Sequence, residues 1–359
     1  MKTALVYDTG LGAYDLGPQH PLRPERVTRS VDLMSTYGLL GHAIEKLPPR
    51  LASDDELLRV HTHAYLRAVK DAGGTGAPSP LTHGLGTPDT PVFVGMHEAS
   101  ALVAGAGIVA VEAVVSGHYR RTFSIAGGLH HAHRDYAAGF CVYNDVAVAI
   151  AHALEHDSSL RVAYVDIDAH HGDGVQEAFY AEPRVLTFSV HESGRYLFPG
   201  TGFPDERGEG AGLGTAFNLP LPPGATDACY RLAFERAVEP AVRAFVPSLI
   251  VLQAGADAHH SDPLTSLGLT LGGYRWLVQR VVRLAEELCD GRIVAFGGGG
   301  YSWEDIVPRA WTMLAGVLAG VELPDALARD DKEPLSPDAE KRLLNEVEAT
   351  ITRLVETRL

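Results

Sequence analysis

The sequence predicts one α/β domain in which helices cover both faces of a mainly parallel sheet. Short apolar runs alternate with segments of helical period along most of the 359-residue chain. The runs are apolar at consecutive positions, which is typical of parallel strands buried on both faces. Neither a repeat nor a linker interrupts the alternation. We therefore expect residues 1–359 to form a single three-layer domain.

The elements follow in order from hydrophobic patterning. The apolar runs predict strands at residues 5–7, 122–125, 162–165, 185–190, 248–253 and 292–296. Helical patterning predicts helices at 25–37, from 53 onward, and at 94–115, 144–156, 175–180, 227–245, 274–288, 308–319 and 337–358. Two glycine-rich stretches, 73–91 and 191–214, predict long irregular loops, which in compact domains are usually functional.

Some helix starts carry a specific signal. Ser53 is an expected N-cap, and Glu56 three residues later completes the pattern of a capping box. Ser336 followed by Pro337 predicts the start of the last helix, because proline suits the first helical position. That helix has an apolar stripe that should pack on the domain body. Its residues are Leu343, Leu344, Val347, Ile351, Leu354 and Val355.

Composition narrows the possible partners and location. The formal net charge of −15 should repel nucleic acid and acidic membranes. The three cysteines have no paired spacing, which fits a reducing compartment. The first residues enter a strand pattern directly, and the apolar stretch 101–115 is too short to span a bilayer. We therefore expect a cytoplasmic protein without nucleic-acid or membrane partners.

Reactive side chains follow four of the predicted strands. They are His130 with His131, the aspartate- and histidine-rich stretch 166–173, Asp257, and Tyr301. The carboxyl ends of parallel strands lie along one edge of a sheet, so these groups should converge there. Ligands in open α/β folds bind at this edge.

The converging groups predict a metal-dependent hydrolase. Asp168, His170 and Asp257 form a suitable three-ligand set with a fourth position open for water, as in catalytic zinc sites. Fe²⁺ or Mn²⁺ would also suit these ligands. Asp166 and Asp173 would remain to accept ring N–H groups from the histidine pair. A tyrosine hydroxyl completes the set of groups that amide hydrolysis needs.

Five motifs, in this order, resemble the zinc-dependent histone deacetylase family of the class I and II type. They are residues 127–131 (GGLHH), 139–141 (GFC), 166–174 (DIDAHHGDG), 198–202 (FPGTG) and 297–301 (GGGGY). The resemblance covers roughly residues 5–320. Within the family, the chain resembles most specifically the bacterial acetoin-utilisation branch. It implies the arginase/deacetylase fold, an α/β/α arrangement with a sheet of about eight strands.

The resemblance also implies roles for individual residues. It assigns zinc to Asp168, His170 and Asp257, and catalytic roles to His130, His131, Asp166, Asp173 and Tyr301. In this pattern Asp166 orients His130 and Asp173 orients His131, while Tyr301 donates to the oxyanion. It places structural potassium on mostly backbone oxygens of Asp166, Asp168, His170, Ser189 and Val190, and a second potassium at Phe179 and Val185.

Substrate positions follow in the same way. Gly139, Phe140 and Phe198 match the walls of a narrow acyl-lysine channel. Asp89 matches a rim aspartate that holds the substrate backbone, and Arg26 matches an arginine of the internal cavity below the metal. Leu264 matches a rim position that is glutamate in polyamine deacetylases.

The implied reaction is removal of acetyl groups from acetyl-lysine side chains of proteins. Zinc would activate water, and His131 would act as general base and later as acid, with His130 mainly electrostatic. The bacterial branch suggests an acetylated metabolic enzyme, such as acetyl-CoA synthetase, as substrate. The oligomeric state, the acyl-chain preference and the native metal stay open.

Three alternatives remain at this point. One is a deacetylase of acetylpolyamines or another small amide, which Leu264 disfavours because a cationic substrate requires an acidic rim. Another is a binuclear manganese ureohydrolase of the arginase type, which would need further bridging aspartates. The last is a metal-binding scaffold without catalysis. Several histidines receive no chemical role: His61, His63, His133, His259 and His260.

Overall fold

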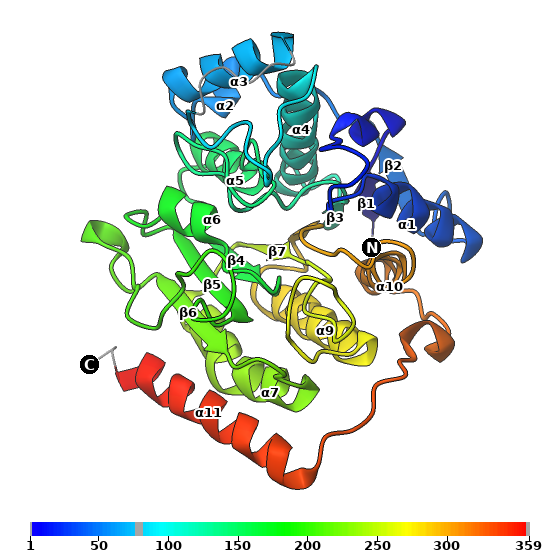
Figure 1. Cartoon of the computed structure of the whole chain (residues 1–359), viewed down its shortest axis with the longest axis vertical. Helices are drawn as coiled ribbons and strands as arrows, with labels where there is room; N and C mark the ends of the chain where they lie inside the picture. The colour runs from blue at the N-terminus through cyan, green and yellow to red at the C-terminus, as the bar shows by residue number, and fades with distance from the viewer. Residues whose placement is uncertain (1, 76–81, 357–359) are drawn as a thin grey trace.

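The computed structural model describes residues 2–75 and 82–356 and contains one eight-stranded sheet (Figure 1). Every pairing in it is parallel, and the strand order is β2-β1-β3-β8-β7-β4-β5-β6. The strands are β1 Thr3–Val6, β2 Ile44–Leu47, β3 Arg121–Ser124, β4 Val162–Asp166, β5 Val185–Glu192, β6 Ala216–Leu221, β7 Leu249–Gln253 and β8 Ile293–Phe296. The predicted parallel α/β architecture is confirmed.

Helices cover both faces of the sheet. They are α1 Glu25–Thr36, α2 Asp54–Leu57, α3 His63–Thr75, α4 Met96–Val115, α5 Asp145–His156, α6 Asp173–Ala178, α7 Asp227–Ala233, α8 Glu239–Phe245, α9 Leu271–Leu288, α10 Ile306–Ala319 and α11 Pro337–Glu356. Figure 1 shows α4 and α5 on one side of the sheet and α9 and α10 on the other. Short 3₁₀ turns occur at η1 Thr9–Ala13, η2 Gly210–Gly212 and η4 Asp325–Ala328.

The sheet has a hydrophobic core on each face, because successive side chains of a strand point to opposite faces. In β4, Ala163 and Val165 pack in the core that contains Trp311 of α10. Val162 and Tyr164 pack in the core that contains the α4 and α5 side chains. Both faces of the central strands are therefore buried, as their continuous apolar sequences predict.

The two edge strands were not predicted from the sequence. β2 is only four residues long and exposes Glu45 and Lys46. β6 contains Pro220, which lowers the strand signal of its sequence. Both strands occupy sheet edges, where polar residues and proline are tolerated because one side of the strand has no ladder to complete.

The helix predicted over 227–245 contains an interruption. A π-helical segment, η3 Phe234–Val238, separates α7 from α8. Pro240 lies in the first turn of α8 and has no N–H to donate to the preceding turn. The π-helical segment ends at Val238, two residues before this proline interrupts the α-helical hydrogen-bond ladder.

Other helix predictions agree closely with the structure. Ser53 caps α2 and forms the predicted capping box with Glu56, although α2 ends at Leu57 and α3 begins separately. The α4 helix is long and apolar enough to cross a membrane, but 67% of its apolar window is buried within the fold. It packs on β1, β3 and β8 and on α5, so it is a core helix.

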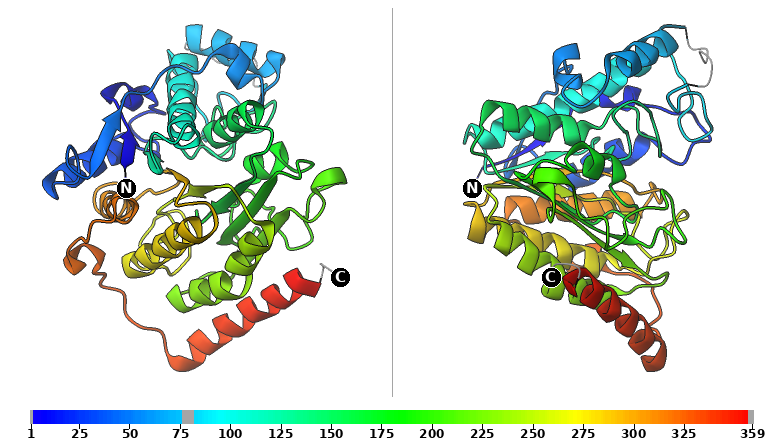
Figure 2. Two further views of the ribbon diagram at one scale, coloured as in Figure 1. Left: turned by 180° about the vertical axis from the view of Figure 1, so that it is seen from behind. Right: turned by 90° about the vertical axis from the view of Figure 1, so that its left-hand side faces the viewer.

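The last helix, α11, lies across the outside of α7 and β6 (Figure 2). It begins at Pro337 as predicted, and its predicted last residues, 357 and 358, lie outside the described residues. Val347, Ile351 and Leu354 are buried, whereas Val355 is 48% exposed. The apolar stripe is therefore one residue narrower than the sequence pattern predicts.

This packing gives a matched pair of stability tests. Val347→Ala removes two methyl groups from a fully buried position and should lower the free energy of unfolding by about 1.5–3 kcal/mol. Val355→Ala makes the same change at an exposed position of the same helix and should change it by less than about 0.5 kcal/mol. Urea unfolding of both variants would contradict this packing if the two losses were equal.

Candidate metal centre and active site

The reactive groups converge because the strands that precede them are neighbours. β3, β8, β7 and β4 occupy consecutive positions in the sheet, and their carboxyl ends lie at one edge. The loops after these strands carry, in that order, the His130–His131 pair, Tyr301, Asp257 and the stretch 166–173. The convergence predicted from the sequence is thus a consequence of the observed strand order.

The three predicted metal ligands form one buried cluster. Asp168 and Asp257 are fully buried, and His170 is 7% exposed. One ligand atom of each lies within 4.8 Å of the others. Nδ1 of His170 is 2.9 Å from Oδ2 of Asp257 and 3.3 Å from Oδ1 of Asp168. Two carboxylates thus share one imidazole nitrogen.

The electrostatics of this cluster fit a divalent cation. Burial opposes protonation of His170, but its hydrogen bonds to Asp168 and Asp257 outweigh burial and raise its pKa to about 10. Burial, together with repulsion from Asp168, raises the pKa of Asp257 to about 7. A metal cation that replaced the proton on Nδ1 of His170 would neutralise both carboxylates, so the raised pKa values of His170 and Asp257 would no longer be needed to balance their charge. Two carboxylates and one imidazole are a donor set that zinc accepts.

Backbone groups pack tightly around the two carboxylates. The Gly299 N–H donates to Oδ2 of Asp168 at 2.6 Å, and the Ala169 N–H donates to Oδ1 of Asp257 at 2.8 Å. A Cβ atom on Gly299 would lie 1.9 Å from Oδ2 of Asp257, and one on Gly255 would lie 2.1 Å from Oδ2 of Asp168. The glycines at these positions therefore permit the close approach of three loops.

Each histidine of the pair has its own carboxylate. Nδ1 of His130 lies 2.9 Å from Oδ2 of Asp166, and Nδ1 of His131 lies 2.7 Å from Oδ1 of Asp173. A carboxylate can only accept, so both Nδ1 atoms carry a proton and donate. The tautomer leaves Nε2 as the nitrogen that can exchange a proton in each ring.

The two imidazoles differ in charge. Burial opposes protonation of His130, but Asp166 and Asp168 outweigh it and raise its pKa to about 9. Burial and the neighbouring His130 lower the pKa of His131 to about 4. At neutral pH His131 is therefore the neutral partner and able to accept a proton, whereas His130 is cationic.

Tyr301 directs its ring toward the same centre. The ring makes edge contacts with His170, at a centroid distance of 6.3 Å, and with Phe140, at 5.8 Å. Burial, followed by Asp257 and Asp168, raises the pKa of its hydroxyl well above its usual range. The hydroxyl therefore remains a hydrogen-bond donor at every physiological pH.

The predicted channel residues lie around His131. A Cβ atom on Gly139 would lie 2.6 Å from Cδ2 of His131 and 2.8 Å from Cε1 of Phe198, so only glycine fits between the two rings. Gly139 also has a φ of +52°, which favours glycine. Phe198 contacts His131 edge-on at 5.0 Å and is 42% exposed. Phe140 instead packs edge-on against Tyr301 and His20, so Gly139 and Phe198 contact His131 while Phe140 borders the tyrosine.

Comparison with known proteins agrees with this geometry. The histone deacetylase domain matches residues 20–318. The chain belongs to the histone deacetylase family. It is 43% identical to the acetoin utilization protein AcuC of Bacillus subtilis over 90% of this chain and 84% of that protein, and 39% identical to AcuC of Staphylococcus aureus over 87% and 80%.

Solved structures show the same fold. A histone deacetylase homologue from Aquifex aeolicus aligns with a TM-score of 0.84 and 31% identity, covering 99% of this chain and all of that one. A homologue solved in complex with SAHA aligns equally well. The chain is therefore a hydrolase of the deacetylase type with the arginase/deacetylase fold. Members of this family use a divalent metal, for which the cluster of Asp168, His170 and Asp257 is a candidate site.

Sequence analysis missed the residues that hold the histidine loop of this deacetylase. The fully buried carboxylate of Asp145 accepts the N–H groups of Gly128 at 3.0 Å and Leu129 at 2.7 Å. The Asn144 amide donates to the carbonyls of His130 and Ala132 at 3.2 and 2.9 Å. Both residues begin α5, where the sequence predicts a helix start, but their partners are 12 to 17 residues away and are not visible in a local pattern.

Asp262 was also missed and connects two parts of the site. Its Oδ2 accepts the backbone N–H of Tyr301 at 2.9 Å, and its Oδ1 accepts that of Leu264 at 3.0 Å. Burial raises the pKa of Asp262 to about 6. The loop after Asp257 is thereby fastened to the loop that presents Tyr301.

His133, which has no role in the sequence analysis, shares Asp173 with His131. Its Nε2 lies 3.2 Å from Oδ2 of Asp173, and its Nδ1 contacts Glu177. Burial opposes its protonation, but the hydrogen bonds to Asp173 and Glu177 outweigh burial and raise its pKa to about 9. A cavity of about 520 Å³ beside this network is bordered by Tyr136 and Phe198.

Two of the remaining predicted positions lie on loops, and the third is buried. Asp89 and Leu264 are on exposed loops, and the Asp89 carbonyl accepts from Nε2 of His20 at 3.3 Å. Arg26 is buried and donates to the carbonyls of Gly298 and Gly300 at 2.5 and 3.5 Å. Its place in an internal cavity stays a prediction.

The potassium positions occupy neighbouring strands. Asp166 at the end of β4 is in register with Ser189 of β5, which precedes Val190. Phe179 and Val185 lie at opposite ends of the turn between α6 and β5. The assignment of potassium to these positions rests on the family resemblance and stays a prediction.

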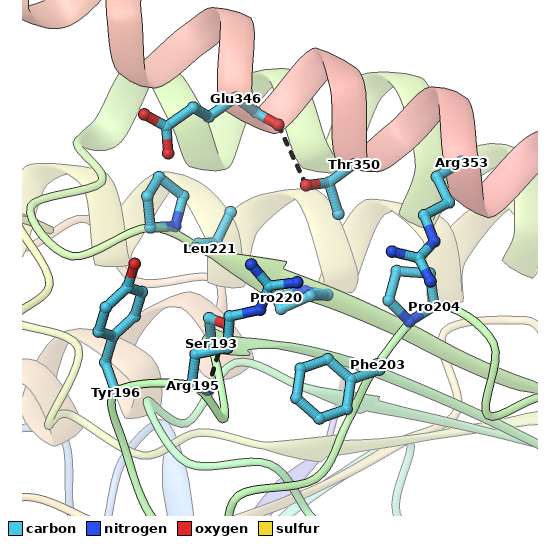
Figure 3. A pocket seen from close by; sticks show the side chains of 11 residues that line it. Ser193, Arg195, Tyr196, Phe203, Pro204, Pro220, Leu221, Glu346, Thr350 and Arg353 are labelled. Atoms are coloured by element: carbon cyan, nitrogen blue, oxygen red, sulfur yellow. Dashed lines mark hydrogen bonds between the residues drawn. The ribbon is translucent and has the colours of Figure 1, made fainter.

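A separate cavity of about 180 Å³ lies between the loop after β5, the end of β6 and α11 (Figure 3). Tyr196, Phe203 and Pro220 border it, and Thr350 on its α11 side donates to the Glu346 carbonyl at 3.0 Å. It contains none of the predicted site residues.

The Asp262 bridge predicts a kinetic effect. Asp262→Ala leaves the buried N–H group of Tyr301 unpaired, and the partly buried one of Leu264, and should lower kcat for deacetylation roughly 10–100-fold with a smaller change in KM. Asp262→Asn keeps a carbonyl oxygen that can accept these hydrogen bonds, so its kcat should fall less than that of Asp262→Ala. An unchanged kcat in folded Asp262→Ala would exclude this positioning role.

The His133 contacts predict a pH-dependent stability. The pKa of His133 is raised from 6.5 to about 9 in the folded state, so its contribution is complete below about pH 6.5 and disappears as pH rises through 9. The difference in free energy of unfolding between the wild type and His133→Phe should therefore be larger at about pH 6 than at about pH 10. Urea unfolding at both pH values measures it, and a pH-independent difference would contradict the assignment.

Proposed function

We propose that the protein hydrolyses acetyl-lysine side chains of other proteins and releases acetate. One observation carries this proposal: a buried metal-ligand cluster, two carboxylate-supported histidines and a protonated tyrosine meet at one sheet edge. The family membership supports the deacetylase reaction class. A water molecule adds to the acetyl carbon, the amide C–N bond breaks, and the lysine amine and acetate leave separately.

Asp168, His170 and Asp257 would hold the divalent metal. When bound, the metal supplies a Lewis acid for the amide carbonyl and lowers the pKa of a water molecule. Zinc suits this donor set, and Fe²⁺ or Mn²⁺ would also suit it. Structural potassium is proposed at the matched backbone oxygens of the β4 and β5 region.

His131 is the proposed general base and acid. Its Nδ1–H is bonded to Asp173, so Nε2 is the atom that takes a proton from water and later delivers it to the departing amine. His130 is held by Asp166 in the same tautomer, and its positive charge stabilises developing negative charge.

Tyr301 is the proposed donor to the oxyanion. Its raised pKa keeps the proton on the hydroxyl, and Asp262 fixes the backbone from which the ring projects. The glycines before Tyr301 allow the chain to turn sharply toward the cluster.

The rim favours a protein substrate over a polyamine. Leu264 is 39% exposed and apolar, where a cationic polyamine would require a carboxylate. Gly139, Phe140 and Phe198 suit the uncharged methylene chain of an acetylated lysine. An exposed Asp89 is proposed to hold the substrate backbone, as the rim aspartate of related enzymes does.

The proposed activity also suggests where the enzyme works and which protein it acts on. A net charge of −15 disfavours nucleic acid, and we expect a cytoplasmic enzyme that acts on an acetylated metabolic protein such as acetyl-CoA synthetase. We also expect SAHA, which is bound to a solved homologue, to compete with acetyl-lysine peptide.

The central prediction concerns Tyr301. Tyr301→Phe removes only the donor and should lower kcat for an acetyl-lysine peptide roughly 10²–10³-fold, while zinc content and fold are unchanged. Release of acetate by zinc-loaded protein measures the effect. Activity that persists at the wild-type rate in Tyr301→Phe would exclude the proposed mechanism.

A substrate comparison separates the remaining alternatives. The zinc-loaded wild type should cleave acetyl-lysine peptide with a higher kcat/KM than acetylspermidine. The opposite preference would favour a polyamine deacetylase, and no cleavage of either by metal-loaded protein would favour a binding protein. Leu264→Glu should shift the ratio toward acetylspermidine.

A further inference from the structure

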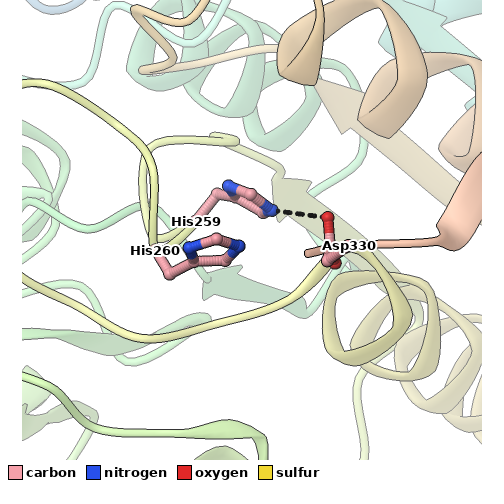
Figure 4. Close-up of side chains that lie close together, drawn as sticks. All are labelled: His259, His260 and Asp330. Carbon is pink, nitrogen blue, oxygen red and sulfur yellow. Dashed lines mark hydrogen bonds and ion pairs between the residues drawn. The ribbon is translucent and has the colours of Figure 1, made fainter. Parts of the chain in front are cut away.

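A second group of metal-ligating side chains lies outside the candidate active site. His259 and His260 belong to the loop after β7, and Asp330 lies between η4 and α11. One ligand atom from each residue lies within 4.8 Å of the others. Figure 4 shows the two rings and the carboxylate brought together from these separate segments. The cluster therefore depends on the tertiary structure.

The spacing of the atoms suits one metal ion. Nε2 of His259 lies 3.0 Å from Oδ1 of Asp330. In the candidate catalytic cluster, Nδ1 of His170 lies 2.9 Å from Oδ2 of Asp257. With bonds of about 2.0–2.2 Å, neighbouring ligands of a tetrahedral ion are about 3.3 Å apart. The His259–Asp330 pair therefore already has nearly the spacing of two ligands, and a ligand atom of His260 lies within 4.8 Å of both.

Outer contacts orient two of these ligands. Nδ1 of His259 lies 2.9 Å from Oγ of Ser261 and would donate to it when Nε2 binds the ion, in place of the weaker 3.3 Å contact in which it accepts the Ser261 N–H. Oδ2 of Asp330 accepts the Leu271 N–H at 2.5 Å. These contacts occupy the far atom of each side chain and direct the near atoms toward each other. Metal ligands commonly have this kind of outer support.

No side-chain hydrogen bond among the described residues accounts for the position of the His260 ring in this cluster. Its ring lies 4.3 Å from the His259 ring, is half-buried, and makes no side-chain hydrogen bond within residues 2–75 and 82–356. A neutral imidazole with a free nitrogen is the form that binds metals.

We propose that His259, His260 and Asp330 bind a second divalent transition-metal ion. Two imidazoles and one carboxylate suit Zn²⁺ and its imidazole-preferring neighbours rather than Ca²⁺ or Mg²⁺. Burial and the positive charge of Lys332 lower the pKa of His260, and against the effect of burial the positive charge of Arg309 lowers the pKa of Asp330. These positive charges oppose any bound cation, so the affinity would have to come from the imidazole nitrogens, which suit Zn²⁺ better than Ca²⁺ or Mg²⁺.

The ion would connect the C-terminal segment to the active-site loop. Asp330 precedes α11, while His259 lies between Asp257 and Asp262 in sequence. The loop that holds a candidate catalytic ligand would thus be fastened from outside. The proposal is independent of the reaction proposed for the catalytic cluster.

Metal counting tests it. The full chain is stripped with a chelator, reloaded with Zn²⁺ and freed of excess metal, and zinc per chain is measured by mass spectrometry. We expect two ions in the wild type and one in His260→Ala, which leaves the His259–Asp330 hydrogen bond intact. His118→Ala, a matched change at an exposed histidine, should keep two.

A second measurement separates the two sites. Asp257→Ala should lose deacetylase activity and keep one zinc, whereas His260→Ala should keep activity and lose the thermal stabilisation that the second zinc provides. One zinc in the wild type, or equal zinc in the wild type and His260→Ala, would overturn the proposal. Either result would leave a hydrogen bond between His259 and Asp330 only.

Discussion

Two buried carboxylates that share one imidazole nitrogen are the constraint on which this structure depends. β4 and β7 pair in register, with Asp166 opposite Gln253, so the chains that leave these strands bring Asp168 and Asp257 together. Such a pair is unfavourable in a protein interior unless cations and N–H groups surround it. The Gly299 and Ala169 amides supply part of that environment, and a divalent metal would supply the rest.

Other buried carboxylates around the site also accept hydrogen bonds from neighbouring loops. Asp145, Asp173 and Asp262 are largely buried carboxylates that each hold groups from another loop: backbone amides for Asp145, two imidazoles for Asp173, and the Tyr301 amide for Asp262. Hydrogen bonds to charged groups are stronger than neutral ones, and a buried carboxylate without them would be costly. Part of the acidic composition of the chain is therefore internal and orders the loops of the candidate site.

Sequence patterning was accurate where burial is uniform. The central strands are apolar on both faces, and their lengths and order along the chain follow directly from that pattern. It failed at the sheet edges, where β2 is short and β6 contains Pro220, and at the π turn before Pro240. In each case a long-range pairing or a single proline outweighs local propensity.

Hydrophobic patterning alone predicts the fold class, the sheet edge where the reactive groups meet and the candidate ligands, because strand period and the parallel topology fix which residues lie at that edge. The individual atom pairs depend on how the loops fold. The tertiary structure pairs His133 with Asp173, Asp262 with the Tyr301 amide, and His259 with Asp330. Those partners are 39 to 71 residues apart, and their contacts depend on loop conformations that no local pattern specifies.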